Sequence, residues 1–120
     1  MKKALIIKNG KLITDNAEIA DTFFSRFRGL MLRKSVEADY ALHIIPCNQI
    51  HTFSMRFPID VVYLSNDGTV IEIHENIRPN KICKTVKKAE SVIELNASMS
   101  SKLGIFKGDV LEIRARVRDS

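Results

Sequence analysis

Short apolar segments alternate with turn signals along the 120 residues of this chain. Two of those signals are strong, Asn9-Gly10 and Asn66-Asp67-Gly68, because asparagine and glycine tolerate the positive φ of tight hairpin turns. The apolar segments are short and often alternate with polar residues, which indicates strands. The predicted strands are 4–8, 11–14, 40–45, 59–64, 69–75, 91–96 and 110–114. The pattern predicts a mostly β fold, a small antiparallel sandwich or barrel.

A first short helix is predicted near residues 23–30. Phe23, Phe27 and Leu30 recur at helical spacing and would share one face, with the arginines of the segment pointing outward. Asp21 or Thr22 can cap its first turn, and Gly29 can end it in a left-handed conformation.

A second short helix is predicted over 97–103, closed by Gly104. Residues 15–22 and 32–39 are predicted to be connections between elements. Residues 76–88 are predicted to form a long surface loop, with an edge strand around Ile82. The two helices would cover the ends of the β structure.

Length and composition bound the architecture further. A chain of 120 residues predicts one domain, 1–120, large enough for its own core. The apolar run after Met1-Lys2-Lys3 ends at Lys8, too early for an export signal, and no run approaches a membrane span. We therefore expect a cytoplasmic protein whose two cysteines are reduced thiols. The net charge of +5 permits a polyanionic partner without identifying one.

Four motifs occur in order along the chain: Arg28-Gly29-Leu30-Met31 with Arg33, the stretch 51–61, Glu94-Leu95-Asn96-Ala97, and Gly104 with Lys107-Gly108-Asp109. Together they resemble the bacterial and archaeal family known as domain of unknown function 192, over about residues 11–114. The resemblance implies a compact jelly-roll-like or barrel fold. It implies no activity, because the family is uncharacterised.

The stretch from His51 to Asp60 carries the densest group of chemically useful side chains. It leads into the most apolar predicted strand, where an aspartate is costly unless it is hydrogen-bonded. His51, Asp60 and Asn96 could meet in one pocket, with the carboxylate orienting the imidazole for acid–base catalysis. The alternative is that Asp60 caps a turn through backbone amides and that His51 is a hydrogen-bonded residue at the boundary of the core.

A pocket beside this stretch is the leading functional hypothesis. Arg33 and Arg56 could grip an acidic ligand, because a guanidinium binds carboxylate or phosphate through two N–H groups. The other predicted ligand-binding residues are Met55, Asn96, Cys47 and Asn48. We expect a small-molecule binding module, and an enzyme using the His51–Asp60 pair is the alternative.

Metal and thiol chemistry are weaker hypotheses. His43, Cys47 and His51 are spaced by four, which suits metal ligation only on a helix, and Pro46 interrupts the run. Cys47 with His51 could instead form a thiolate–imidazole pair, although no third activating group is evident. We predict no metal site and no cofactor.

A basic face is the third functional hypothesis. The alternating arginines Arg114, Arg116 and Arg118 project from one side of the last predicted strand. Together with Lys84, Lys87 and Lys88 they could bind nucleic acid without sequence preference. The simpler interpretation is a solvated edge that discourages strand-to-strand aggregation. With no aromatic residues interleaved, nucleic acid is an unlikely partner.

Overall fold

The computed structural model describes residues 1–116, which form one mostly β unit with seven strands and two short helices. In chain order the elements are β1 (Lys2–Lys8), β2 (Lys11–Ala20), α1 (Phe23–Arg28), β3 (Ala41–Ile44), β4 (Ile59–Leu64), β5 (Val70–Ile77), β6 (Ser91–Asn96), α2 (Met99–Lys102) and β7 (Leu111–Ala115).

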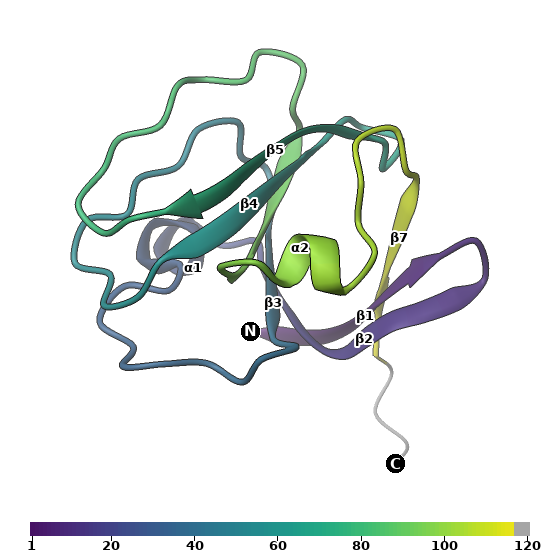
Figure 1. Ribbon diagram of the computed structural model, residues 1–120, viewed down its shortest axis with the longest axis horizontal. Coiled ribbons are helices and arrows are strands. Elements are labelled where there is room, and N and C mark those ends of the chain that lie inside the picture. The colour runs from purple at the N-terminus through teal and green to yellow at the C-terminus, as the bar shows by residue number, and fades with distance from the viewer. Residues whose placement is uncertain (117–120) are drawn as a thin grey trace.

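All seven strands belong to one sheet, in the order β5-β4-β6-β3-β2-β1-β7. Every pair is antiparallel except β2–β3, which is parallel, so the sheet is mixed where the sequence predicted antiparallel pairing alone. The sheet curves and does not close. Its two edges touch at one end only, where the Val70 amide donates to Asp109 O at 2.7 Å and the Leu111 amide donates to Gly68 O at 2.9 Å (Figure 1).

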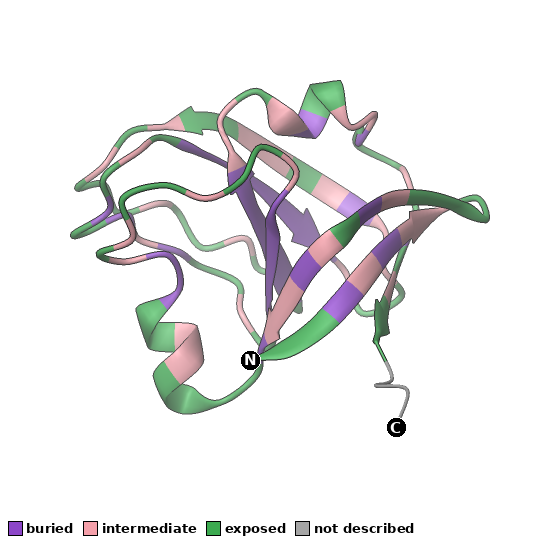
Figure 2. Ribbon diagram, turned by 90° about the horizontal axis from the view of Figure 1, so that it is seen from below, coloured by how far each residue is buried: buried purple, intermediate pink, exposed green. Residues whose placement is uncertain are grey.

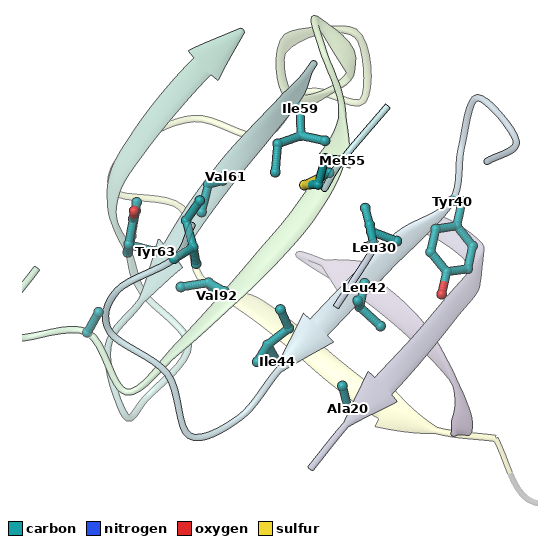
Figure 3. Packing of buried hydrophobic residues seen from close by; sticks show 12 residues of the cluster. Ala20, Leu30, Tyr40, Leu42, Ile44, Met55, Ile59, Val61, Tyr63 and Val92 are labelled. Carbon is teal, nitrogen blue, oxygen red and sulfur yellow. The ribbon is translucent and has the colours of Figure 1, made fainter. Parts of the chain in front are cut away.

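Side chains cover both faces of the central strands. Residues of β3 and β4 are buried along their whole length, which explains why these segments are nearly continuous apolar runs. One face packs under α1 and the loops, in a cluster that includes Leu30, Ile44 and Met55 (Figure 3). The other face packs under α2, in a cluster that includes Val62, Ile93 and Leu95.

The strongest turn signals are confirmed. Asn9 and Gly10 have φ of 52° and 73° between β1 and β2, and the Asn66–Gly68 turn connects β4 with β5. The prediction that residues 15–22 form a connection is wrong, because β2 continues to Ala20. Polar side chains in this part of the strand have partners. Asn16 Nδ2 donates to Asp39 Oδ1 at 3.1 Å.

Helix α1 begins and ends as predicted, but its aromatic residues face the solvent. The Thr22 side chain accepts a hydrogen bond from the Ser25 amide, and Gly29 follows the last turn with φ of 47°. Leu30 is buried, whereas Phe23 and Phe27 are 81% and 61% exposed. The expected inward face is therefore wrong, since α1 lies at the periphery and only the chain after it reaches the core (Figure 2).

Candidate functional site

The segment from Cys47 to Met55 lies beside the loop that follows β5. Thr52 is fully buried, and its hydroxyl donates to Arg78 O at 2.7 Å and accepts from the Lys81 amide at 2.8 Å. Further along, the Cys83 amide donates to Ile50 O at 3.1 Å. Two long loops without regular structure are thus fixed to each other, so the side chains that they carry are positioned by backbone hydrogen bonds.

Asp60 has a complete set of hydrogen bonds on the face under α2. Its carboxylate accepts from the amides of Asn76, Ser98 and Ser100 at 2.9, 3.1 and 3.0 Å, and from the Ser100 hydroxyl at 2.7 Å. The side chain is fully buried. Asp60 therefore fastens α2 and the end of β5 to β4, as the backbone-capping alternative described.

His51 and Asp60 do not form a pair in the part of the chain that the structure describes. His51 is half-buried on the opposite side of the sheet, its Nδ1 accepts from the Phe53 amide at 3.2 Å, and its ring stacks on that of Phe53. Because all four hydrogen bonds of Asp60 go elsewhere, the carboxylate does not orient the imidazole.

The other predicted site residues fall into separate places. Asn96 donates to Val36 O and Glu37 O at 3.2 and 3.0 Å, and so fixes the 31–40 segment. Arg33 lies 3.9 Å from a Glu18 carboxylate oxygen, in a different hollow that also contains Tyr40. Arg56 is exposed and Met55 is part of the core. Of the residues expected to line one pocket, His51 and Met55 do share a cavity, whereas Asp60 is buried on the other face of the sheet, against Ser100.

A surface groove does form between α1 and the chain that follows β3. It has a volume of about 590 Å³, and its walls include three predicted residues, Cys47, Asn48 and His51. Phe23 and Phe27 of α1 form an aromatic wall. Arg26, Lys87 and Glu90 supply the charged groups. The groove is therefore apolar on one side and carries more positive than negative charge.

A smaller cavity continues from this groove toward the sheet. Its volume is about 50 Å³, and it shares Arg26, Phe27, Ile44, Cys47, Gln49 and His51 with the groove. Leu30 and Met55 line its apolar part, and Glu94 of β6 lies in its wall. A space of this size can hold a few water-sized groups.

Glu94 is the functional candidate that the sequence did not suggest. It is 3% exposed and shares a face of β6 with Val92, so its carboxyl lies in the apolar cluster under α1. Its Oε1 has no hydrogen-bond partner within residues 1–116. Burial raises the pKa of this carboxyl to about 7, because removal from water penalises the charged form. Near neutral pH it can donate an O–H or accept a hydrogen bond.

Gly29 leaves the space that Glu94 occupies. A Cβ at this position would lie 3.2 Å from Glu94 Oε1, a close approach that the glycine avoids. The same residue has a positive φ, which L side chains rarely adopt. The end of α1 and the buried carboxyl are thus adapted to each other, and the Arg28-Gly29 and Glu94-Leu95 motifs meet here.

A second polar atom beside this cavity also has no partner. Arg26 Nη1 donates to Pro46 O at 3.0 Å, but its Nε is buried without a hydrogen-bond partner in the described chain. Buried donors are normally satisfied, so each exception requires an explanation. An acid and a guanidinium N–H that line one cavity and both lack partners are suited to a bound polar group.

The cysteines near the cavity are protonated thiols. Burial raises the pKa of Cys47 above its usual value, and its Sγ donates a hydrogen bond to Gln49 O at 3.2 Å. Burial likewise raises the pKa of Cys83. Since the thiolate is the reactive form, this environment does not activate Cys47 as a nucleophile.

His43 lies apart from the groove. It lines a different hollow, next to Leu64 and Gly68, and burial lowers its pKa to about 4, so it is neutral. Within residues 1–116, no three histidine, cysteine or acidic side chains gather closely enough to hold a metal ion. The spacing of His43, Cys47 and His51 therefore does not become a shared site.

The residues of the predicted basic face lie at different edges of the sheet. Arg114 is on β7 and pairs with Glu112 at 2.7 Å. Lys84, Lys87 and Lys88 line a hollow beside β5, which is the other edge strand. Arg118 lies outside the described residues.

Comparison with known proteins identifies the family. The sequence model of DUF192, described as "Uncharacterized ACR, COG1430", matches residues 4–113. The chain belongs to the DUF192 family. A relative from Thermococcus sibiricus, named a UPF0127 protein, is 36% identical over 109 residues, which are 86% of this chain and 69% of the relative. The predicted resemblance is confirmed.

Solved structures share the DUF192 fold seen here. A protein from Sinorhizobium meliloti 1021, described as a candidate transcription regulator, superposes with a TM-score of 0.78 at 27% identity, covering 93% of this chain and 92% of its own. A protein of unknown function from Novosphingobium aromaticivorans superposes with a TM-score of 0.79 at 21% identity, covering 92% and 83%. No helix in the described part of the chain is long and apolar enough to span a membrane.

Proposed function

We propose that this DUF192 domain binds a small molecule carrying an anionic group, in the groove between α1 and the Pro46–His51 segment. The observation that supports this proposal is the inner cavity, where the buried Arg26 Nε and Glu94 Oε1 both lack hydrogen-bond partners among the described residues. Small-molecule sites are commonly concave and largely apolar, with a few convergent polar groups, and the groove with its inner cavity has that composition.

The charges at the groove favour an anion. Arg26 lines both the groove and the inner cavity, and Lys87 lies in the outer wall. Glu90 is the acidic residue in the outer wall. A guanidinium binds carboxylate and phosphate oxygens through charge-assisted hydrogen bonds. The exposed rings of Phe23 and Phe27 can cover the apolar body of the same ligand.

The geometry supports binding more than catalysis. An acid–base mechanism needs an oriented pair, but His51 and Asp60 lie on opposite faces of the sheet. A thiol mechanism needs a thiolate, but burial raises the pKa of Cys47. The enzyme hypothesis therefore has less support than a binding module. Nucleic-acid binding stays the third hypothesis. The description of the Sinorhizobium protein as a transcription regulator applies to that protein alone. In this chain the basic residues Arg114 and Lys84, Lys87 and Lys88 lie at two different edges of the sheet.

The test is an amide NMR titration with three anions of similar body: 3-phenylpropionate, phenyl phosphate and benzenesulfonate. We expect at least one of them to shift the amides of Phe23, Arg26, Cys47 and His51. Arg26→Ala should weaken that binding about 10- to 100-fold, because it removes a charge-assisted hydrogen bond.

Arg56→Ala is the control, since Arg56 is an exposed arginine that lines neither the groove nor the inner cavity. It should leave the affinity unchanged. Shifts that gather around Arg56 and disappear in Arg56→Ala would move the site away from the groove. No shift with any of the three anions would refute the proposal.

A further inference from the structure

We infer that the ligand of this groove is a small carboxylic acid, whose carboxylate enters the inner cavity and bridges Arg26 Nε–H and the carboxyl of Glu94. This inference rests on the proposed function and specifies the ligand. It assigns a binding role to Glu94, which the sequence motifs did not suggest. It also accounts for two buried polar atoms that lack partners within residues 1–116.

The two protein groups match the two oxygens of a carboxylate. Arg26 Nε supplies one N–H, and a protonated Glu94 supplies one O–H. The rest of the lining combines the apolar Leu30, Ile44 and Met55 with the polar Arg28, Gln49 and His51. A phosphate or sulfonate would bring a third oxygen beyond the two that Arg26 Nε and Glu94 can pair, and a buried oxygen without a donor costs stability. The volume of about 50 Å³ also suits the three heavy atoms of a carboxylate.

The protonation of Glu94 follows from its surroundings. The strands and loops around it present Leu42 and Val61, which are its neighbours in the sheet, and the thiols of Cys47 and Cys83. Burial raises the pKa of both thiols and of the Tyr63 hydroxyl, so these groups are neutral near pH 7. Arg26 and Arg28 line the cavity from α1, and His51 lines it from the 47–55 segment.

Binding of a carboxylate to protonated Glu94 has a defined pH dependence. The ligand stays ionised above about pH 5, whereas Glu94 loses its proton as the pH rises through about 7. If only the protonated form binds, affinity should fall roughly 30-fold between pH 6.0 and pH 8.5. An ammonium ligand on ionised Glu94 would have the opposite dependence.

The experiment measures the affinity of three compounds that differ only in their head group, by calorimetry or NMR at pH 6.0 and 8.5. They are 3-phenylpropionate, 3-phenylpropionamide and 3-phenylpropylamine. We expect the acid to bind most tightly and to weaken roughly 30-fold at the higher pH. Tighter binding of the amine, strengthening with pH, would overturn the inference.

Two variants of Glu94 separate its role from a structural one. Glu94→Gln keeps a side-chain N–H donor, so it should bind the acid within a few-fold of the wild-type affinity at pH 6.0 and lose the pH dependence. Glu94→Leu removes the donor and should bind at least tenfold more weakly. The pH series is repeated in His51→Gln, because histidines titrate in the same range.

The outcomes distinguish this inference from the proposed function. If the acid binds in an Arg26-dependent manner but Glu94→Gln retains the full pH dependence, the groove binds anions and the role of Glu94 is refuted. Tighter binding of phenyl phosphate than of the acid would also refute the carboxylate inference and leave the proposed function intact. If the acid does not bind at all, the carboxylate inference fails, and the other two anions decide the proposed function.

Discussion

Two buried acids on neighbouring strands, Asp60 and Glu94, differ in how their carboxyl groups are hydrogen-bonded. Asp60 of β4 lies under α2 and accepts four hydrogen bonds, three of them from backbone amides. Glu94 of β6 lies under α1, and its Oε1 has no partner in residues 1–116. The two strands pair directly, with Val61 opposite Glu94 and Asp60 opposite Leu95.

The contrast separates a structural carboxylate from a functional candidate. Four hydrogen bonds make Asp60 a joint between β4, β5 and α2. Nothing comparable stabilises a charge on Glu94, so burial raises its pKa to about 7. A buried polar group without a partner reduces stability, and a ligand can supply what the protein does not.

The largest expected effect comes from changing Asp60, the buried acid whose hydrogen bonds are all made within the protein. In Asp60→Asn the side-chain amide can accept from one set of donors but presents an N–H₂ to the other, so at least two charge-assisted hydrogen bonds are lost. We expect the free energy of unfolding to fall by about 3 to 5 kcal/mol, measured by urea denaturation. Asp15→Asn, on an exposed position of β2, is the control and should change it by less than about 0.5 kcal/mol. A similar small change in Asp60→Asn would contradict the structural role.

The next effect concerns how stability depends on pH. The pKa of Glu94 is raised in the folded state, so its contribution is fully present below its unfolded value near 4.5 and is lost as pH rises through about 7. The wild type should therefore lose on the order of 3 kcal/mol relative to Glu94→Gln between pH 4.5 and pH 8. Urea denaturation of both proteins across that range gives the difference. If the free energies of unfolding of the two proteins depended on pH in the same way, the pKa of Glu94 would not be raised in the folded state.

The smallest effect concerns the glycine that faces Glu94. Gly29→Ala should cost about 1 to 2 kcal/mol, because an L side chain is strained at φ of 47°. Gly10→Ala has a similar positive φ with nothing within 4 Å of the added Cβ. Both variants should lose stability, but only Gly29→Ala should change the pH dependence assigned to Glu94. Equal pH profiles in the two variants would mean that Gly29 and Glu94 are independent.

The sequence predicted the elements better than the site. β4 and β6 match the predicted ranges 59–64 and 91–96, because their apolar runs are bounded by clear turn signals. The extension of β2 was missed because Asp15, Asn16 and Glu18 resemble a polar connection. Their partners, such as Asp39 and Tyr40, come from a segment about 20 residues later, which local patterns do not reveal.

Glu94 was missed for a related reason. In an isolated strand a glutamate between isoleucine and leucine indicates a solvated face. Here both faces of β6 are covered, and only the tertiary arrangement of α1 and the 47–55 segment buries this side chain. The sequence did contain a usable signal. Val92 and Ile93 before Glu94 and Leu95 after it form a nearly continuous apolar run, which is typical of a strand buried on both faces.

The position of β7 has a consequence for how the chain folds. β7 pairs with β1, so the first and last strands of the described chain lie side by side, and Lys8 lies opposite Leu111. Such contacts between distant positions slow folding, because the intervening chain must be ordered before they form. During synthesis β1 can pair with β2 at once but keeps an open edge until residues 111–115 emerge. Nascent chains should therefore depend most on protection from aggregation in the interval between these two pairings.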